Sequence, residues 1–277
     1  MCGMCYGAVE RILIKMNGNT KTPEPALPEH ACVQVAAELE RQLLPKTAPL
    51  IGGAEVAGWS IYSSKLGGDF FDYHVFEGVC CPSSRSMRIV VGDAADHGLC
   101  SALLMTTTRA YLRARAMQAG TLAQVIDDVN RLLCMDTASA GHFVTAFFAL
   151  IDGPERKIAW VRAGHDPALL YDPAKDMFEP LNGSGIALGV DPHARYTMNT
   201  RSGLPKGAVV SIATDGLWET RFGNDGASGM DAVRELVRQH HHESAASIAD
   251  AVKKATHDSY RGSKAEDDMT FVAVKYV

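Results

Sequence analysis

Acidic residues stand at four places where an apolar segment of the chain meets a glycine or another acid. Asp69, Asp93 and Asp215 each adjoin a glycine, and Asp267 adjoins Asp268. A neighbouring glycine lets backbone and ligand approach closely, and a strand end fixes the carboxylate, as a hard cation such as Mg²⁺ or Mn²⁺ requires. Each acid alone is also typical of a capped turn. The four places together favour a shared metal site.

Electrostatic repulsion decides what must accompany these acids if they converge. Two unit charges ~4 Å apart repel by about 4 kcal/mol at an effective dielectric constant near 20. No Lys or Arg adjoins Asp93, Asp215 or Asp267 in the sequence, so two divalent cations are the simplest neutralising partners. Water shared by two such ions loses a proton near neutral pH, and the ions clamp an in-line displacement at phosphorus. The pattern therefore predicts a two-metal site that hydrolyses a phosphate ester.

Apolar periodicity predicts the elements that must position the acids. Strands that follow strands, interleaved with helix pairs, favour antiparallel sheets covered by helices, an α+β sandwich in layers. Neither a GxGxxG nor a P-loop motif is present, so no nucleotide site is expected. The expected strands are 59–62, 70–76, 87–91, 143–151, 157–163, 168–171, 208–214 and 269–277, and the expected helices are 32–44, 101–117, 122–135, 228–240 and 244–260.

Composition places the chain among ordinary globular proteins. It has 277 residues, 47% of them hydrophobic and 21% charged, with 27 basic and 32 acidic residues for a net charge of −5. The basic excess of a nucleic-acid binder is missing, and no stretch approaches the ~20 apolar residues of a membrane span or the order of a signal peptide. We therefore expect a cytoplasmic protein with a tail or linker (1–31), a lead-in amphipathic helix (32–45) and one main domain (46–277).

Cysteine usage indicates reduced thiols, because the seven cysteines are odd in number and scattered. Cys2 and Cys5 form a CxxC pair, but no second pair follows to complete a zinc site. Cys5 and Arg11 have the spacing of a cysteine-phosphatase loop, yet they lie in an unpatterned segment with one glycine between them. We interpret that spacing as chance.

Seven ordered blocks resemble the bacterial SpoIIE/RsbU-like branch of the metal-dependent protein phosphatases, the type 2C or PPM superfamily. The resemblance extends from about residue 36 to residue 277 and includes a segment, 40–45, similar to the lead-in helix of that family. It implies an αββα four-layer sandwich of two antiparallel sheets between helices. The blocks are LGGDFFD (66–72), VGDAADHG (91–98) followed by ALLM (102–105), FVT (143–145), AGHDP (163–167), ALG (187–189), ATDGLWE (213–219) and DDMT (267–270).

The resemblance also implies roles for particular residues. Asp93 would bridge two Mn²⁺ or Mg²⁺ ions, and the backbone carbonyl of Ala94 would complete one coordination shell. Asp215 and Asp267 would bind the second ion, while Asp69 would hold the first, partly through water. Asp268 is the less favoured acid of its pair.

The block at 91–98 departs from the family, because Asp96 replaces a small residue. Its carboxylate could bind metal or water, but a helix N-cap ahead of Ser101 is the favoured interpretation. His97 is a candidate proton donor to the leaving seryl oxygen, since histidine titrates near neutrality. His165, in a Gly-His-Asp-Pro turn, is expected to be a structural hydrogen-bonding residue.

These features predict a phosphoserine/phosphothreonine protein phosphatase in which hydroxide held by two metal ions attacks phosphorus directly. The resemblance implies a phosphorylated anti-anti-sigma protein of the STAS type as substrate, in a partner-switching pathway. A non-catalytic regulatory binding module on the same fold is the alternative, and a metal phosphodiesterase is a third interpretation. The apolar stripe of Val35, Leu39 and Leu43 could form a homodimer or pack on its own domain.

Overall fold

The computed structural model describes residues 29–77, 85–137, 141–223, 226–260 and 265–277. Val33–Val277 form one compact unit, and the description below concerns that unit. The Cys2 and Cys5 pair, the Cys5 and Arg11 spacing and nearly all of the expected tail lie outside the described residues. Within the described ranges, no helix combines the length and apolar character needed to cross a bilayer.

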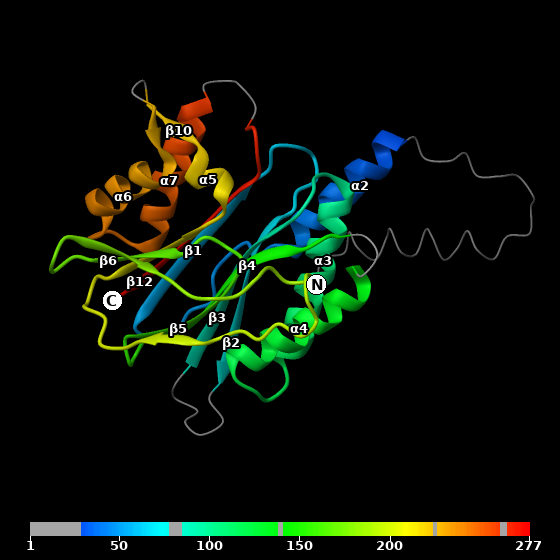
Figure 1. Ribbon diagram of the computed structural model, residues 1–277. Coiled ribbons are helices and arrows are strands. Elements are labelled where there is room, and N and C mark those ends of the chain that lie inside the picture. Colours follow the sequence, from blue (N-terminus) through cyan, green and yellow to red (C-terminus); the bar gives the residue numbers. More distant parts are fainter. Residues whose placement is uncertain (1–28, 78–84, 138–140, 224–225, 261–264) are drawn as a thin grey trace, which may run out of the picture. The chain divides into compact units, whose positions relative to one another are not determined.

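Two five-stranded antiparallel sheets form the centre of this unit (Figure 1). Sheet A has the strand order β1-β12-β9-β6-β7, and sheet B has the order β2-β3-β4-β5-β8. Sheet A contains β1 (Ala54–Ile61), β6 (Ala168–Asp172), β7 (Met177–Leu181), β9 (Val209–Ala213) and β12 (Met269–Tyr276), and sheet B contains β2 (Asp69–Glu77), β3 (Arg85–Ala94), β4 (Val144–Asp152), β5 (Lys157–Ala163) and β8 (Asn199–Arg201).

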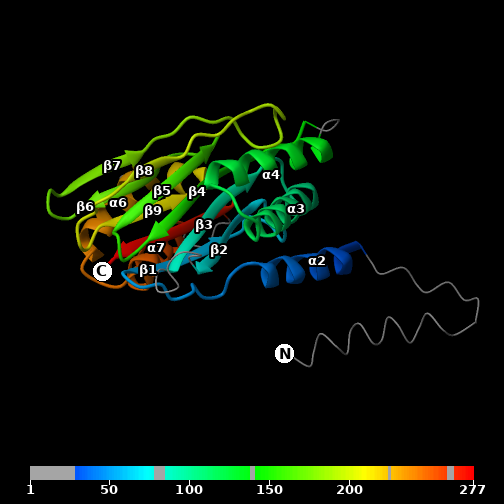
Figure 2. The same ribbon diagram turned by 90° about the horizontal axis from the view of Figure 1, so that it is seen from below.

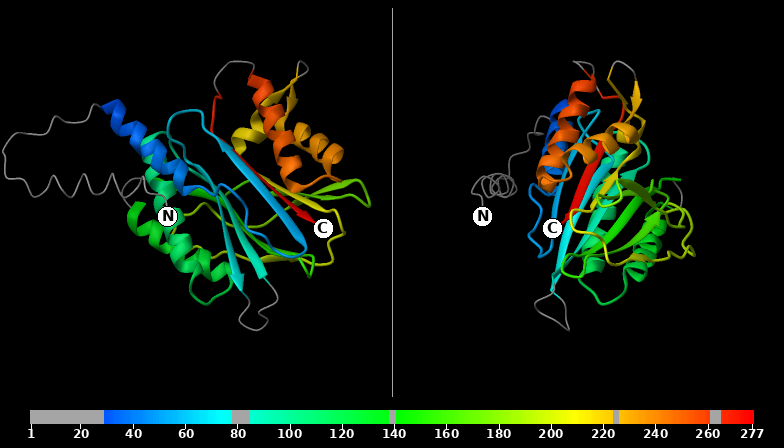
Figure 3. Two further views of the ribbon diagram at one scale, coloured as in Figure 1. Left: turned by 180° about the vertical axis from the view of Figure 1, so that it is seen from behind. Right: turned by 90° about the vertical axis from the view of Figure 1, so that its left-hand side faces the viewer.

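Helices cover the outer face of each sheet, as Figures 2 and 3 show. Sheet B is covered by α3 (Leu99–Ala116) and α4 (Leu122–Thr137), and sheet A by α5 (Asp215–Glu219), α6 (Gly229–His240) and α7 (Ala245–Tyr260). A short ribbon of β10 (Arg221–Phe222) and β11 (Ala227–Ser228) lies between α5 and α6 in the sequence. The predicted α+β sandwich with antiparallel sheets, the αββα arrangement, is confirmed.

Three apolar cores hold these layers together. Side chains between the sheets, such as Phe147 of sheet B and Val274 of sheet A, are completely buried. Ile126 belongs to the core beneath α3 and α4, and Phe271 to the core beneath α5 to α7. Burying one such side chain stabilises the fold by roughly 1.5–3 kcal/mol, so the layers fix the strand ends on which the acids lie.

Several elements differ from the sequence-based expectations. The strand expected to end at residue 91 continues to Ala94, because the register with β2 and β4 extends through Asp93. Asp215 begins helix α5 instead of lying in a turn. The strands β7 and β8 were not predicted; they are edge strands with largely exposed side chains, so they lack the apolar pattern of a central strand.

Helix α2 (Glu29–Leu43) precedes β1 and packs through the side opposite to the predicted stripe. Ala37 is buried against Leu66 and Ala102. Val35 and Leu39 remain 56% and 58% exposed, so packing on its own domain does not explain these two positions.

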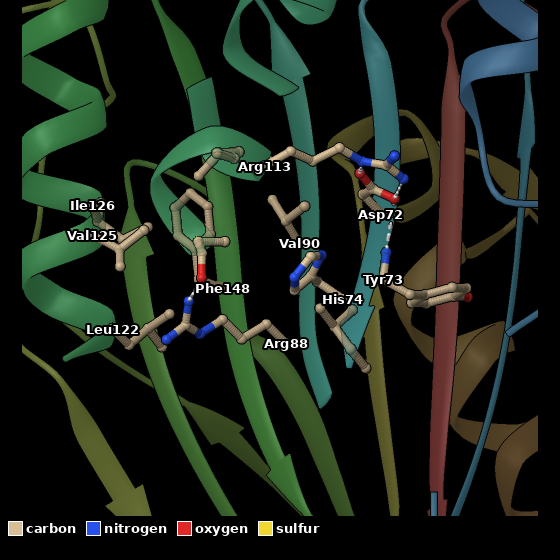
Figure 4. A pocket seen from close by; sticks show the side chains of 13 residues that line it. Asp72, Tyr73, His74, Arg88, Val90, Arg113, Leu122, Val125, Ile126 and Phe148 are labelled. Carbon is tan, nitrogen blue, oxygen red and sulfur yellow. Dashed lines mark hydrogen bonds and ion pairs between the residues drawn. The ribbon is translucent and has the colours of Figure 1, made fainter. Parts of the chain in front are cut away.

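A buried ion pair fixes α3 to the outer face of sheet B. Asp72 of β2 accepts hydrogen bonds from Arg113 Nε at 2.6 Å and Nη2 at 2.8 Å (Figure 4), and Arg109 Nε lies 3.1 Å from Asp72 Oδ2. The Asp72 side chain lines a largely apolar pocket of about 420 Å³, including the space open to solvent, between sheet B and the two helices. Of the predicted metal ligands, none lines this pocket. The ion pair of Asp72 with Arg109 and Arg113 fixes α3, the helix that follows the loop after Asp93.

Candidate metal centre

The β2–β3 pairing places two of the predicted ligands side by side. Asp69, the first residue of β2, lies directly opposite Asp93, the penultimate residue of β3. Directly opposed residues of antiparallel strands have Cα atoms about 4.5–5.5 Å apart. Asp93 in turn lies opposite Thr145 of β4. The strand register of sheet B therefore brings Asp69 and Asp93 together.

Sheet A presents the other two acids at ends of neighbouring strands. Asp215 follows β9, and Asp267 precedes β12, which pairs with β9. The pairing continues past the strands, because Thr214 N–H donates to the Thr270 carbonyl at 3.1 Å. A Cβ on Gly216 would lie 2.1 Å from the Asp268 carbonyl oxygen, so only glycine permits α5 to approach the segment after Asp267.

Thr214 joins the two sheets at this edge. Its Oγ1 donates to Asp69 Oδ2 at 2.7 Å and accepts from Thr270 N–H at 2.9 Å. Thr214 and Asp69 are each 1% exposed. The acids of sheet A and those of sheet B are thus held at a common edge by one buried hydroxyl. Sequence reasoning missed Thr214, although its position just before an Asp-Gly pair was the available signal.

The electrostatics of the site indicate that the carboxylates lie close enough to repel. Burial, followed by the charges of Asp215, Asp267 and Asp268, raises the pKa of Asp93 to about 7. Burial and then the charge of Asp93 also raise the pKa of Asp69, against the stabilising hydrogen bond from Thr214. No basic side chain of the described residues compensates the negative charge at this edge, so a proton or a cation would balance it there.

The donor chemistry of the site fits divalent cations such as Mn²⁺ or Mg²⁺. Asp93 is partly buried, and Asp215 and Asp267 are exposed, so carboxylate oxygens reach both the interior and the solvent. Hard oxygen donors with unbalanced charge are what such ions bind. As the side chains stand, no three His, Cys, Asp or Glu residues of the described ranges are grouped closely enough to hold an ion. Coordination therefore requires side-chain rotation toward the ion.

Ala94, the predicted carbonyl ligand, lies against a glycine of the β2 lead-in. Its N–H donates to the Gly68 carbonyl at 3.2 Å, and a Cβ on Gly68 would lie 2.5 Å from the Ala94 oxygen. Residue 68 must be glycine for the two backbones to approach this closely. This contact fixes the Ala94 peptide beside both acids of sheet B.

Asp268 anchors the loop that leads to Asp69. Its Oδ1 accepts from the N–H and the hydroxyl of Ser63 at 2.8 and 2.9 Å, and its Oδ2 accepts from Gly68 N–H at 2.9 Å. Both oxygens are thereby engaged with the 63–68 loop. The sequence contained the acid doublet as a signal but gave no indication of these partners.

The predicted N-cap role of Asp96 is wrong. Helix α3 begins at Leu99 with Gly98 as its N-cap and without a side-chain cap. Asp96 adopts a positive φ of 82°, and its Oδ1 accepts from the N–H of His97 at 2.9 Å. This local bond stabilises the turn instead of the helix. His97, the candidate proton donor, is exposed next to Asp96 on the loop that follows Ala94.

His165 is buried next to the acidic edge. Its Nδ1 lies 2.9 Å from the Asp166 carbonyl oxygen, and the residue is 3% exposed. Burial lowers its pKa, partly opposed by the contact with Asp166 and by the charge of Asp215. A neutral imidazole that donates to the backbone is thus the form the site favours.

Comparisons with known proteins agree with this architecture. The sequence profile of the family described as Stage II sporulation protein E (SpoIIE) matches residues 83–277. Protein IcfG of Synechocystis sp. is 22% identical over 263 residues, which cover 86% of this chain and 40% of that protein. Phosphoserine phosphatase RsbP of Bacillus subtilis is 24% identical over 184 residues, which cover 61% of this chain and 44% of RsbP. The chain thus matches less than half the length of either relative.

A solved structure shares the fold over almost its whole length. The SiaA-PP2C domain of Pseudomonas aeruginosa superposes with a TM-score of 0.74 at 19% sequence identity, covering 90% of this chain and 97% of that domain. At this identity the likeness supports the αββα fold and the strand order on which the acids lie.

Proposed function

Since the chain belongs to the SpoIIE family of serine/threonine phosphatases, we propose that its acidic edge hydrolyses phosphoserine or phosphothreonine in a regulatory protein with the help of two bound divalent cations. The observation that carries this proposal is the environment of Asp93. Its carboxyl is partly buried near other acids, and its pKa is raised to about 7. A site built for a neutral ligand would have no need of such repulsion.

The residues that would hold the ions are Asp93, Asp215 and Asp267, with the Ala94 carbonyl and Asp69. When bound, Mn²⁺ or Mg²⁺ would supply positive charge for the phosphoryl oxygens and lower the pKa of water. The packed layers of the chain hold the strand ends on which these acids lie.

Two other residues prepare the site for its substrate. Thr214 fixes the orientation of Asp69 through its 2.7 Å hydrogen bond. His97, exposed on the loop after Ala94, is proposed to donate a proton to the leaving seryl oxygen. A proton donor must reach the leaving group from solvent, and an exposed position suits that role.

The proposed substrate is a phosphorylated STAS-type anti-anti-sigma protein in a partner-switching pathway. Membership of the SpoIIE family supports this choice, as does the similarity to RsbP. A solved structure described under the bacterial stressosome, 17% identical with a TM-score of 0.56, has the same fold. Removing phosphate from such a partner would change which protein it binds.

The test is phosphate release from a phosphoserine peptide by the purified chain. We expect release with Mn²⁺ or Mg²⁺, none in excess EDTA, and recovery when metal is restored. Hydrolysis that persists in excess EDTA would contradict the proposal. An inert protein that binds two ions would instead indicate the non-catalytic binding module, and preferential cleavage of diesters would indicate a metal phosphodiesterase.

We also propose that the chain forms a homodimer through α2. Val35 and Leu39 lie one helical turn apart and are more than half exposed. Two copies could cover each other's apolar stripe. Light scattering should give the mass of a dimer for the wild-type chain and of a monomer for the Val35→Glu/Leu39→Glu variant; a monomeric wild type would contradict this proposal.

A further inference from the structure

Glu40 is a buried carboxyl group in helix α2. It is 4% exposed, although acids are almost never buried so completely unless they are paired. No basic side chain of the described residues forms an ion pair with it. Burial raises its pKa, and hydrogen bonding by Gly67 opposes that shift. A residue that is this costly to bury and contributes no ion pair needs another explanation.

The Glu40 carboxylate holds the loop that leads to Asp69. Its Oε1 accepts from Gly67 N–H at 3.1 Å, and the Tyr62 hydroxyl lies close enough to the carboxylate to lower its pKa as well. Tyr62 lies nearby: burial and then the charges of Glu40, Asp69 and Asp268 raise the pKa of its hydroxyl. Glu40 thus stands at the far end of the same acidic edge.

Gly67 is closely packed between Tyr62 and Asp268. A Cβ on this residue would lie 2.3 Å from the Tyr62 ring and 2.6 Å from Asp268 Oδ2. A side chain at residue 67 would therefore displace Tyr62 or the Asp268 carboxylate, so the Glu40 carboxylate contacts the chain at a position that must be glycine.

Gly68, the next residue, connects Gly67 to the candidate metal centre through two hydrogen bonds. Gly68 N–H donates to Asp268 Oδ2 at 2.9 Å, and its carbonyl accepts from Ala94 N–H at 3.2 Å. Asp69 follows directly in the chain. Hydrogen bonds and the covalent chain together thus connect Glu40 of α2, through Gly67 and Gly68, to the Ala94 N–H and to Asp69.

We propose that Glu40 is a positioning residue of the catalytic site. Its carboxylate fixes the Gly67–Gly68 backbone so that the Ala94 peptide and Asp69 keep the geometry that a divalent cation needs. Helix α2 is accordingly part of the support of the site, and its role is more than that of a connecting segment. That the site is catalytic rests on the proposed function. That Glu40 fixes the Gly67–Gly68 backbone does not.

The experiment compares Glu40→Ala and Glu40→Gln with Glu38→Ala. Glutamine keeps an acceptor oxygen for Gly67 N–H and removes the charge. Glu38 is a matched control on the same helix, because its side chain is 63% exposed and its partners among the described residues are Gln42 and Arg41. Each full-length variant is examined metal-free by hydrogen exchange and then by Mn²⁺ titration calorimetry.

In Glu40→Ala, the Gly67 and Ala94 amides should exchange about tenfold faster, and Mn²⁺ should bind about 10–100-fold more weakly. Glu40→Gln should restore most of both properties, and Glu38→Ala should match the wild type. If Glu40→Ala does not fold, Glu40→Asp, whose carboxylate is one methylene shorter, should show the same pair of defects.

A folded Glu40→Ala with wild-type exchange at Ala94 and wild-type Mn²⁺ affinity would overturn the proposal, even if its melting temperature fell. Glu40→Gln as defective as alanine would also overturn it, because the acceptor oxygen would then be irrelevant. Neither readout requires catalysis. If both change as expected in a chain that hydrolyses no phosphoserine, the positional role stands and the proposed function fails.

Discussion

Two acids of strand β2, three residues apart, are buried in opposite surroundings. Asp72 faces α3 and is neutralised by Arg113 and Arg109. Asp69 faces the edge between the sheets, where its neighbours are a threonine hydroxyl and further acids. Arginine thus neutralises a buried carboxylate at one position of β2, whereas no basic side chain of the described residues does so at the other. The proposed divalent cations would balance the charge that is left uncompensated there.

Replacing Asp93 with asparagine should have the largest effect, because it removes the carboxylate on which the repulsion converges. Hydrolysis of a phosphoserine peptide should fall by at least about 100-fold, since loss even of outer groups around a metal costs 10–100-fold. Steady-state kinetics with Mn²⁺ would show this, with circular dichroism confirming the fold. Activity within tenfold of the wild type would remove Asp93 from the site.

Replacing Asp72 with alanine should affect stability instead of chemistry. Removing one partner of a buried ion pair lowers the free energy of unfolding by about 3–5 kcal/mol, because the buried Arg109 is left uncompensated. Urea denaturation measures the loss. The control is Glu179→Ala, which breaks the exposed pair with Arg201 and should cost less than about 1 kcal/mol. Equal losses of unfolding free energy in Asp72→Ala and Glu179→Ala would show that the buried ion pair of Asp72 is no more important for stability than an exposed one.

Thr214→Val should lower the free energy of unfolding by about 1–3 kcal/mol, because it leaves buried Asp69 without its donor. Thr214→Ser keeps the hydroxyl and should recover most of that loss. Urea denaturation of both variants in EDTA would show the difference. A Thr214→Val variant as stable as the wild type, with the loss found in Thr214→Ser instead, would show that the methyl group, and not the hydrogen bond to Asp69, explains the role of Thr214.

The pH dependence of stability should reveal the raised pKa of Asp93. Between its ordinary value of 3.8 and about 7, the folded metal-free protein holds a proton that the unfolded chain has released. This contribution to stability therefore decreases as the pH rises and is lost above about pH 7. Asp93→Asn lacks the effect.

Urea denaturation in EDTA at pH 5 and pH 8 isolates this contribution. From pH 5 to pH 8, the free energy of unfolding of the wild type should fall by roughly 1–2 kcal/mol relative to that of the variant, after allowance for solvent screening. A constant difference between the two proteins would mean that Asp93 does not share its surroundings with other acids.

The sequence predicted the layers of the fold well because central strands carry unbroken apolar runs. β5, predicted at 157–163, is observed at Lys157–Ala163. Edge strands such as β8 lack this signal, since one side has no partner and their side chains reach solvent. The paired acids followed from strand ends beside glycine, a local pattern.

The supporting residues were not predictable from local patterns. Thr214 meets Asp69 across 145 positions of sequence, and Asp268 meets Ser63 across 205. Glu40 looked like an ordinary acid of an amphipathic helix. Contacts of this kind depend on how the two sheets and α2 pack, and periodicity along one element contains no information about its partners.

Isothermal titration of Mn²⁺ into the metal-free chain, with Asp93→Asn as the comparison, shows whether these acids bind metal together. Two ions should bind per wild-type chain, and this binding should be lost in the variant. A wild-type chain that binds no Mn²⁺, or a variant that binds it equally well, would show that these acids do not form a metal centre.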